Sequence, residues 1–232
     1  MIPVRVIQPP RVISLKEVVH SGTIPPKILT ESQVWFRENS PPVANIPELA
    51  SLEQWMVVPI FKKMSLLAML DQNKRICDQP IMSAMSHQQF NNEPFYKKRS
   101  RECYWILMRT SWVPNTPEKT LDSMQQVVSA LHPQARMPTV MEIVMCALMI
   151  HEICGYTTFP NQAVRTSDTH RTTKTPIDVR FPTNLATGSI SLYAWPAQIM
   201  VGDADAKSGS ESVGVKSTSI GTTAIIPLPI RE

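Results

Sequence analysis

Glycine is scarce in this chain, and that scarcity excludes a large class of functions. Only 7 of the 232 residues are glycine, whereas loops that bind nucleotide phosphates expose their backbone amides through glycine-rich turns. The four cysteines contain no CxxC pair, and no catalytic or cofactor motif of useful specificity is present. Composition and the order of structural elements therefore carry the functional inference.

Long apolar runs are also missing. The longest, residues 143–150, is far shorter than the roughly 20 residues that cross a bilayer, so we expect no membrane span. The start of the chain has no apolar signal-peptide core. Together with cysteines that show no disulfide pattern, this predicts an intracellular protein of the cytoplasm or nucleus, or one inside an assembled particle.

Proline is abundant, with 21 residues concentrated towards both ends. Proline cannot continue a helix or donate a backbone hydrogen bond, so the ends are predicted to be extended and the middle helical. The expected divisions are an extended N-terminal arm (1–46), a helical core domain (47–155) and an irregular C-terminal arm with short strands (156–232). The predicted fold class is mainly α, with a core of five to six helices between Pro-rich arms.

Residues 139–155 are predicted to form the central helix of that core. Thr139 and Glu142 have the spacing of a capping box, and Gly155 can adopt the left-handed conformation that ends a helix. Because the middle of this stretch is apolar on every side, we expect it to be buried.

The remaining periodicity predicts further elements around this helix. Alternating apolar residues predict short strands at 177–181 and 190–194. Residues 202–219 are expected to be a loop, and the apolar run at 222–230 is expected to dock on the rest of the protein. Helices are predicted at 31–38, from Pro47, along 60–70, from Asp78, at 100–111 and from Thr116.

Residues 97–101 carry four cations, which equal the net charge of +4 of the whole chain. Aromatic residues stand on both sides of them, and cations neutralise phosphates while exposed rings stack on unpaired bases. The cluster is also typical of a solvated or partner-facing surface, or of a nuclear-import signal. The candidate nucleic-acid-binding residues are Lys97, Lys98, Arg99, Arg101, Tyr104 and Trp105.

Metal and catalytic sites find little support. Cys146, His151 and Cys154 are possible ligand types on one helix, with Cys103 as a fourth, but their positions around the helix diverge from a tetrahedral arrangement. The His151-Glu152 pair lacks the second histidine of a zinc protease motif. We therefore expect no catalytic residues, no metal and no cofactor, and identify no small-molecule substrate.

A helical middle with apolar, proline-interrupted arms is typical of subunits that pack their arms on neighbouring copies. The hypothesis is a structural assembly protein, such as a capsid, nucleocapsid or filament subunit of a virion. Its partners would be copies of itself, and single-stranded nucleic acid if it coats RNA or DNA. The alternative is a monomeric or dimeric regulatory adaptor or RNA-binding module whose arms fold back, and a helical enzyme is the third class.

Overall fold

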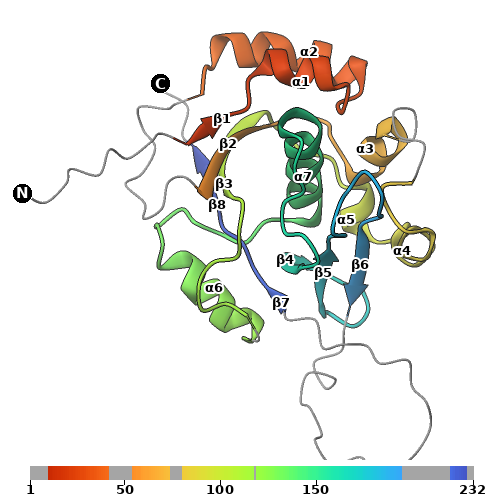
Figure 1. Cartoon of the computed structure of the whole chain (residues 1–232), viewed down its shortest axis with the longest axis vertical. Helices are drawn as coiled ribbons and strands as arrows, with labels where there is room; N and C mark the ends of the chain where they lie inside the picture. The colour runs from red at the N-terminus through yellow and green to blue at the C-terminus, as the bar shows by residue number, and fades with distance from the viewer. Residues whose placement is uncertain (1–9, 42–53, 74–79, 118, 195–219, 229–232) are drawn as a thin grey trace, which may run out of the picture.

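The computed structural model describes residues 10–41, 54–73, 80–117, 119–194 and 220–228. The helices arrange themselves around α7, which runs through the middle of the molecule (Figure 1). The helices are α1 (Leu15–Ser21), α2 (Pro26–Glu38), α3 (Leu66–Asn73), α4 (Ala84–Phe90), α5 (Pro94–Lys97), α6 (Leu121–Ser129) and α7 (Val140–Cys154). The strands are β1 (Arg11–Val12), β2 (Trp55–Ile60), β3 (Tyr104–Arg109), β4 (Ala163–Thr169), β5 (Pro176–Arg180), β6 (Ser191–Ala194), β7 (Ile220–Gly221) and β8 (Ile225–Leu228).

The strands form two four-stranded mixed sheets. Their strand orders are β1-β2-β3-β8 and β6-β5-β4-β7. In each sheet one edge strand is parallel to its neighbour, β1 to β2 and β7 to β4, and the other pairs are antiparallel. The fold is therefore α/β. The prediction of a mainly α protein, with a helical core between extended arms and only a few short strands, is wrong.

The fold class was predicted wrongly because β2 and β3 were not recognised as strands. A helix was predicted at 100–111, but Tyr104–Arg109 form β3, which pairs antiparallel with β2 from Trp55↔Arg109 to Ile60↔Tyr104. Every residue of β2 is buried, as are all of β3 except the partly buried Tyr104. A strand covered on both faces is apolar throughout and lacks the alternation that identifies a strand, so periodicity cannot separate it from a buried helix.

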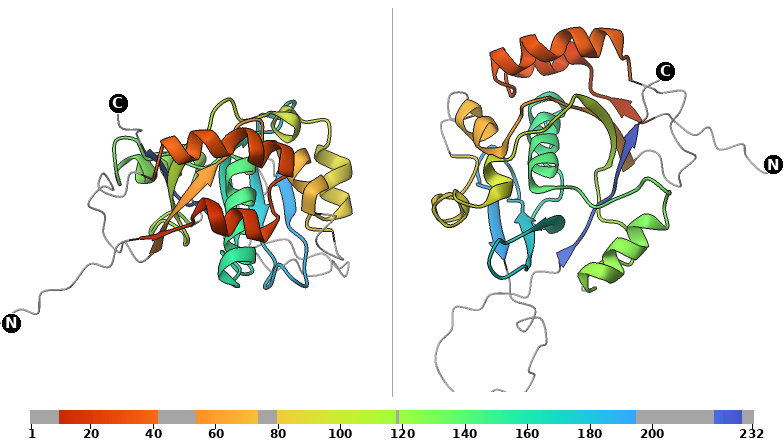
Figure 2. Two further views of the ribbon diagram at one scale, coloured as in Figure 1. Left: turned by 90° about the horizontal axis from the view of Figure 1, so that it is seen from above. Right: turned by 180° about the vertical axis from the view of Figure 1, so that it is seen from behind.

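The N-terminal segment lies against its own chain. β1 extends the first sheet beside β2, and α1 packs against α7. From above, α1 and α2 lie across one end of α7 (Figure 2). The indole Nε1 of Trp105 donates to the carbonyl of Asn39 at 2.8 Å, which fastens the end of α2 to β3. This segment is thus part of the folded unit, where an extended arm was predicted.

The C-terminal segment joins the two sheets. β7 pairs with β4 in one sheet and β8 pairs with β3 in the other, and the three residues between them, 222–224, are fully buried. The outer side of β8 is covered where Arg136 and Ile225 exchange backbone hydrogen bonds of 2.9 Å. The expected docking of the C-terminal apolar run is confirmed for its described residues.

The central helix is confirmed in its position and its ends. α7 begins directly after its N-cap Thr139, which forms the predicted capping box with Glu142, and its C-cap is Gly155, which has φ +74°. All residues from Val140 to Ile150 are buried. The helix contacts α1, α3, α5, β4 and β5, so it is covered by three helices and by two strands of the sheet β6-β5-β4-β7.

Other predictions differ in detail. The strands expected at 177–181 and 190–194 match β5 and β6. The N-cap of α6 is Thr120 instead of Thr116, and α2 starts at Pro26, earlier than predicted. Asp78, the start of the helix from Pro47 and the loop at 202–219 lie outside the described residues. The helix predicted from Asp78 begins only at Ala84, as α4 with the N-cap Ser83, and the helix predicted along 60–70 is α3, which begins at Leu66. One hydrophobic core contains residues of all three predicted divisions, among them Ile13, Val144 and Ile226.

No helix within the described ranges is long and apolar enough to cross a membrane.

Candidate nucleic-acid interface

The predicted cations lie at the end of α5, which includes Lys97, and on the loop that connects α5 to β3. We call residues 97–101 the basic loop. Phe95 and Tyr96 on α5 are buried, with Tyr96 completely covered, and Cys103 is buried just before β3 begins. These anchors hold both ends of the loop to the core. Between them Lys97, Lys98, Arg99 and Arg101 are all exposed.

A second basic turn is hydrogen-bonded to this loop. The backbone N–H of Lys63 donates to the carbonyl of Ser100 at 2.9 Å, and the N–H of Ser100 donates to the carbonyl of Met64 at 2.8 Å. The Ser100 hydroxyl accepts from the N–H of Met64 at 3.0 Å and donates to the carbonyl of Phe61. Lys63 has φ +63°, a left-handed conformation that tightens the turn. As a result, exposed Lys62 and Lys63 stand beside the loop.

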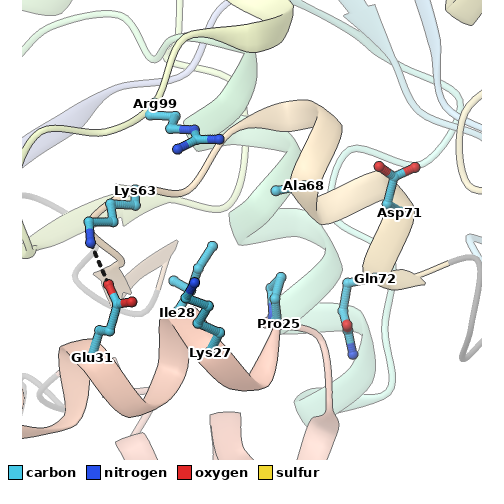
Figure 3. Close-up of a pocket in the computed structure, with 9 residues that line it drawn as sticks. All are labelled: Pro25, Lys27, Ile28, Glu31, Lys63, Ala68, Asp71, Gln72 and Arg99. Atoms are coloured by element: carbon cyan, nitrogen blue, oxygen red, sulfur yellow. Dashed lines mark hydrogen bonds and ion pairs between the residues drawn. The ribbon is translucent and has the colours of Figure 1, made fainter.

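Lys27 on α2 completes the charged region across a cleft of about 430 Å³ that Lys63 and Arg99 also line. Figure 3 shows Arg99 entering this cleft from the side opposite α2. We call the whole region the basic surface. It comprises Lys27, Lys62, Lys63, Lys97, Lys98, Arg99 and Arg101.

Most of this charge is uncompensated. Lys63 pairs with Glu31, with Nζ and Oε2 2.7 Å apart, and this hydrogen bond lowers the pKa of Glu31. Lys97, Arg99 and Arg101 make no ion pair with any residue that the structure describes. Like charges that face water without partners repel one another, so an anion that lies across them is bound favourably.

The aromatic candidates are turned inward. Trp105 is 3% exposed, and its ring packs edge-on against Phe36 with centroids 5.1 Å apart. The Tyr104 hydroxyl donates to Glu142 at 2.7 Å, and burial together with the charge of Glu142 raises its pKa. Trp105 therefore presents no free face beside the cations, and Tyr104 is partly buried with its hydroxyl bound to Glu142. The structure therefore brings the predicted cations together and separates them from base stacking.

Behind the basic surface lies a buried polar cluster at the start of α7. Glu142 is 2% exposed and accepts hydrogen bonds from Tyr104, Arg136 and Thr139. Burial alone would raise the pKa of Glu142, but the hydrogen bonds and charge of Arg136, with those of Thr139 and Tyr104, outweigh it and lower the pKa. This cluster closes the helix end and is a structural element.

Asp168 supports the same helix end. Its Oδ2 accepts from the N–H of Val140 at 2.7 Å, and burial raises its pKa against the lowering effects of that bond and of nearby Lys98. The carboxylate therefore satisfies a helix N–H that has no partner within α7.

The thiols and histidine considered as metal ligands are dispersed. Cys146 is fully buried, and burial raises its pKa well above the ordinary value. Cys103 accepts from the backbone N–H of Lys62 at 3.4 Å, and Cys154 is half-buried with a pKa raised by burial. Among the described residues, no three histidine, cysteine or carboxylate side chains are grouped as a metal site.

Comparison with protein-family models, with curated proteins and with solved structures finds no match to this chain. Sequence reasoning missed Lys27, Lys62 and Lys63 as parts of the basic surface. A signal was present for two of them, because an aromatic residue followed by two lysines occurs both at 61–63 and at 96–98.

Proposed function

We propose that this protein is a nucleic-acid-binding module that contacts the phosphate backbone through the basic surface. The observation that carries the proposal is the joining of two exposed basic segments, 62–63 and 97–101, by the hydrogen bonds of Ser100. Lysine and arginine neutralise successive phosphates and release the counterions that surround them. Since Trp105 is buried, we expect recognition of the backbone with little dependence on base sequence.

The character of the surrounding surface favours nucleic acid over a lipid bilayer. Proteins that lie on anionic membranes combine cations with apolar side chains that enter the bilayer interface. The exposed large hydrophobic residues of the described chain are Val19, Val34, Met85 and Tyr156. None of them belongs to the basic loop or to the turn at 61–64, so the surface offers charge without an inserting apolar group.

The packing of the N-terminal segment bears on the type of nucleic-acid-binding protein. Residues 10–41 lie on their own domain through β1, α1 and the bond from Trp105 to Asn39. This favours a module that binds as a monomer or dimer over a capsid or filament subunit tied together by that segment. Self-assembly remains a separate proposal. Sedimentation that stays monomeric across micromolar concentrations would contradict it.

Binding of single-stranded RNA and DNA as a function of salt tests the proposed function. Each phosphate contact contributes about 0.7 to the slope of log affinity against log salt for single strands. Replacing Lys97, Lys98, Arg99 and Arg101 by alanine should therefore flatten the slope by about 3 and weaken binding at 0.1 M salt by about 100-fold or more. The matched control also replaces four exposed cations by alanine, Lys16, Arg37, Lys119 and Lys174, which lie outside the basic surface, and should change neither quantity.

Binding of the same proteins to vesicles that contain anionic phosphatidylserine is measured in parallel, to distinguish nucleic acid from a lipid surface as the ligand. Equal weakening of oligonucleotide binding by the basic-surface and control variants would contradict the proposal, because general charge would then explain the binding. Tight binding to vesicles without binding to oligonucleotides would also overturn it. Circular dichroism and thermal unfolding of each variant check that the fold is retained.

A further inference from the structure

The cleft within the basic surface has the dimensions and lining of a ligand site. Its volume of about 430 Å³ falls within the roughly 300–1,000 Å³ of small-molecule pockets. The start of α2 forms one wall of the cleft and α3 forms the other. Lys63 of the turn at 61–64 and Arg99 of the loop after α5 line the space between the walls (Figure 3). The lining residues are Pro25, Lys27, Ile28, Glu31, Lys63, Ala68, Asp71, Gln72 and Arg99.

The cationic side of the cleft suits a phosphate group. Arg99 presents a planar guanidinium whose N–H groups match two phosphate oxygens, and it forms no ion pair with the described residues. Lys27 lines the cleft from α2, and Lys63 lines it beside Arg99. The three cations come from segments far apart in sequence, which the fold gathers around a single hollow.

The remaining lining suits the sugar and base of a nucleotide. Ile28 and Ala68 provide apolar surface for the face of a base. The side-chain NH₂ of Gln72 donates to the carbonyl of Gly22 at 3.0 Å, which leaves its amide oxygen as the acceptor. This oxygen favours a ligand with hydroxyl or amino donors. The negative charges of Glu31 and Asp71 in the lining disfavour a bare inorganic phosphate, which carries mainly negative charge.

We infer that this cleft binds one nucleotide, a phosphate joined to a nucleoside, with Arg99, Lys27 and Lys63 holding the phosphate. The inference rests on the proposed function, because the nucleotide would belong to the nucleic acid that lies along the basic surface. It adds a second kind of contact: the exposed cations hold the backbone, and the cleft holds a single nucleotide turned out of the strand.

Filling the cleft without changing its charge provides the test. Ala68→Leu adds volume to the half-buried lining of α3 and suits a helix, since leucine is a strong helix former. It should weaken the binding of AMP, GMP, CMP and UMP, measured by calorimetry, by about tenfold or more, because the ligand's space is occupied. Ala130→Leu makes the same substitution at the exposed C-cap of α6 and should leave nucleotide binding unchanged.

Glu31→Gln should strengthen nucleotide binding, whereas Ala68→Leu should weaken it. Glu31 pairs with Lys63 at 2.7 Å, so its neutral analogue releases the lysine for the phosphate and removes a repelling charge. Removing one unit charge about 4 Å from a phosphate in water corresponds to a gain of about fivefold in affinity. Weaker nucleotide binding by Glu31→Gln would contradict the assigned position of the phosphate.

The outcomes separate the cleft from the proposed function. If wild-type protein binds oligonucleotides but no mononucleotide, or if Ala68→Leu binds mononucleotides normally, the cleft inference is overturned and the proposed function stands. If mononucleotides bind in the cleft but no oligonucleotide binds, the proposed function fails. Inorganic phosphate binding as tightly as the nucleotides would overturn the nucleoside part. Support requires that Ala68→Leu loses mononucleotide binding while oligonucleotide binding keeps its salt slope.

Discussion

Replacing Glu142 by alanine should remove the polar cluster that closes the start of α7. The carboxylate accepts from Nη1 and Nη2 of Arg136 at 3.0 and 2.6 Å, from the Tyr104 hydroxyl at 2.7 Å, and from the N–H and hydroxyl of Thr139 at 2.8 Å each. It is 2% exposed, so these donors would lose their partner inside the protein. The helix that the variant weakens is the one around which the whole fold is arranged.

The size of the effect follows from these contacts. Breaking a buried ion pair by removing one partner costs about 3–5 kcal/mol, but the side chain of Arg136 is 42% exposed and can regain water. We therefore take about 3 kcal/mol, which includes loss of the capping box, itself worth about 1 kcal/mol. For a chain of this length, such a loss lowers the melting temperature by about 6–12 °C. Glu142→Gln keeps one acceptor oxygen and should cost about 2 kcal/mol.

The measurement is urea unfolding of wild type, Glu142→Ala and Glu142→Gln from pH 7 downward. The folded-state pKa of Glu142 lies below its ordinary value of 4.5, so its contribution to stability is fully present above that value and is lost as the pH falls through the folded-state pKa. The difference between wild type and Glu142→Gln should therefore shrink in acid. A difference below about 0.5 kcal/mol at pH 7, or one that grows in acid, would refute the reasoning.

Two further variants test how the ends of the chain are held. A Cβ at Gly221 would lie 2.6 Å from Cδ2 of Trp112, so Gly221→Ala should lower the free energy of unfolding by about 1–3 kcal/mol; an unchanged urea midpoint would contradict the close packing of β7. Trp105→Phe removes the bond to Asn39 and should cost about 2 kcal/mol. It should also speed tryptic cleavage at exposed Arg37, and cleavage no faster than in wild type would argue against this attachment of α2.

Local signals in the sequence were sufficient for α7 and for two strands. The capping box of Thr139 and Glu142 and the left-handed Gly155 act through neighbouring residues only, so they could be recognised without knowledge of the fold. β5 and β6 alternate in sequence, with Ile177 and Val179 apolar in β5 and Leu192 the buried residue of β6, although Asp178 of β5 is also buried and pairs with Arg165. The exposure of the cations at 97–101 was also predictable, since charged side chains rarely enter a core unpaired.

What the sequence by itself determined is the set of segments whose structure depends on near neighbours: the central helix, the alternating strands and the exposed basic loop. Only the tertiary structure decided that Tyr104–Arg109 is a strand. Its backbone hydrogen bonds are made with β2 and β8, which are distant in sequence. The tertiary structure likewise joined both ends of the chain to the core and brought Lys27, Lys62 and Lys63 to the basic loop. The candidate interface is formed by segments that are distant in sequence. Their contact depends on long-range packing and hydrogen bonding, which a local sequence pattern cannot predict.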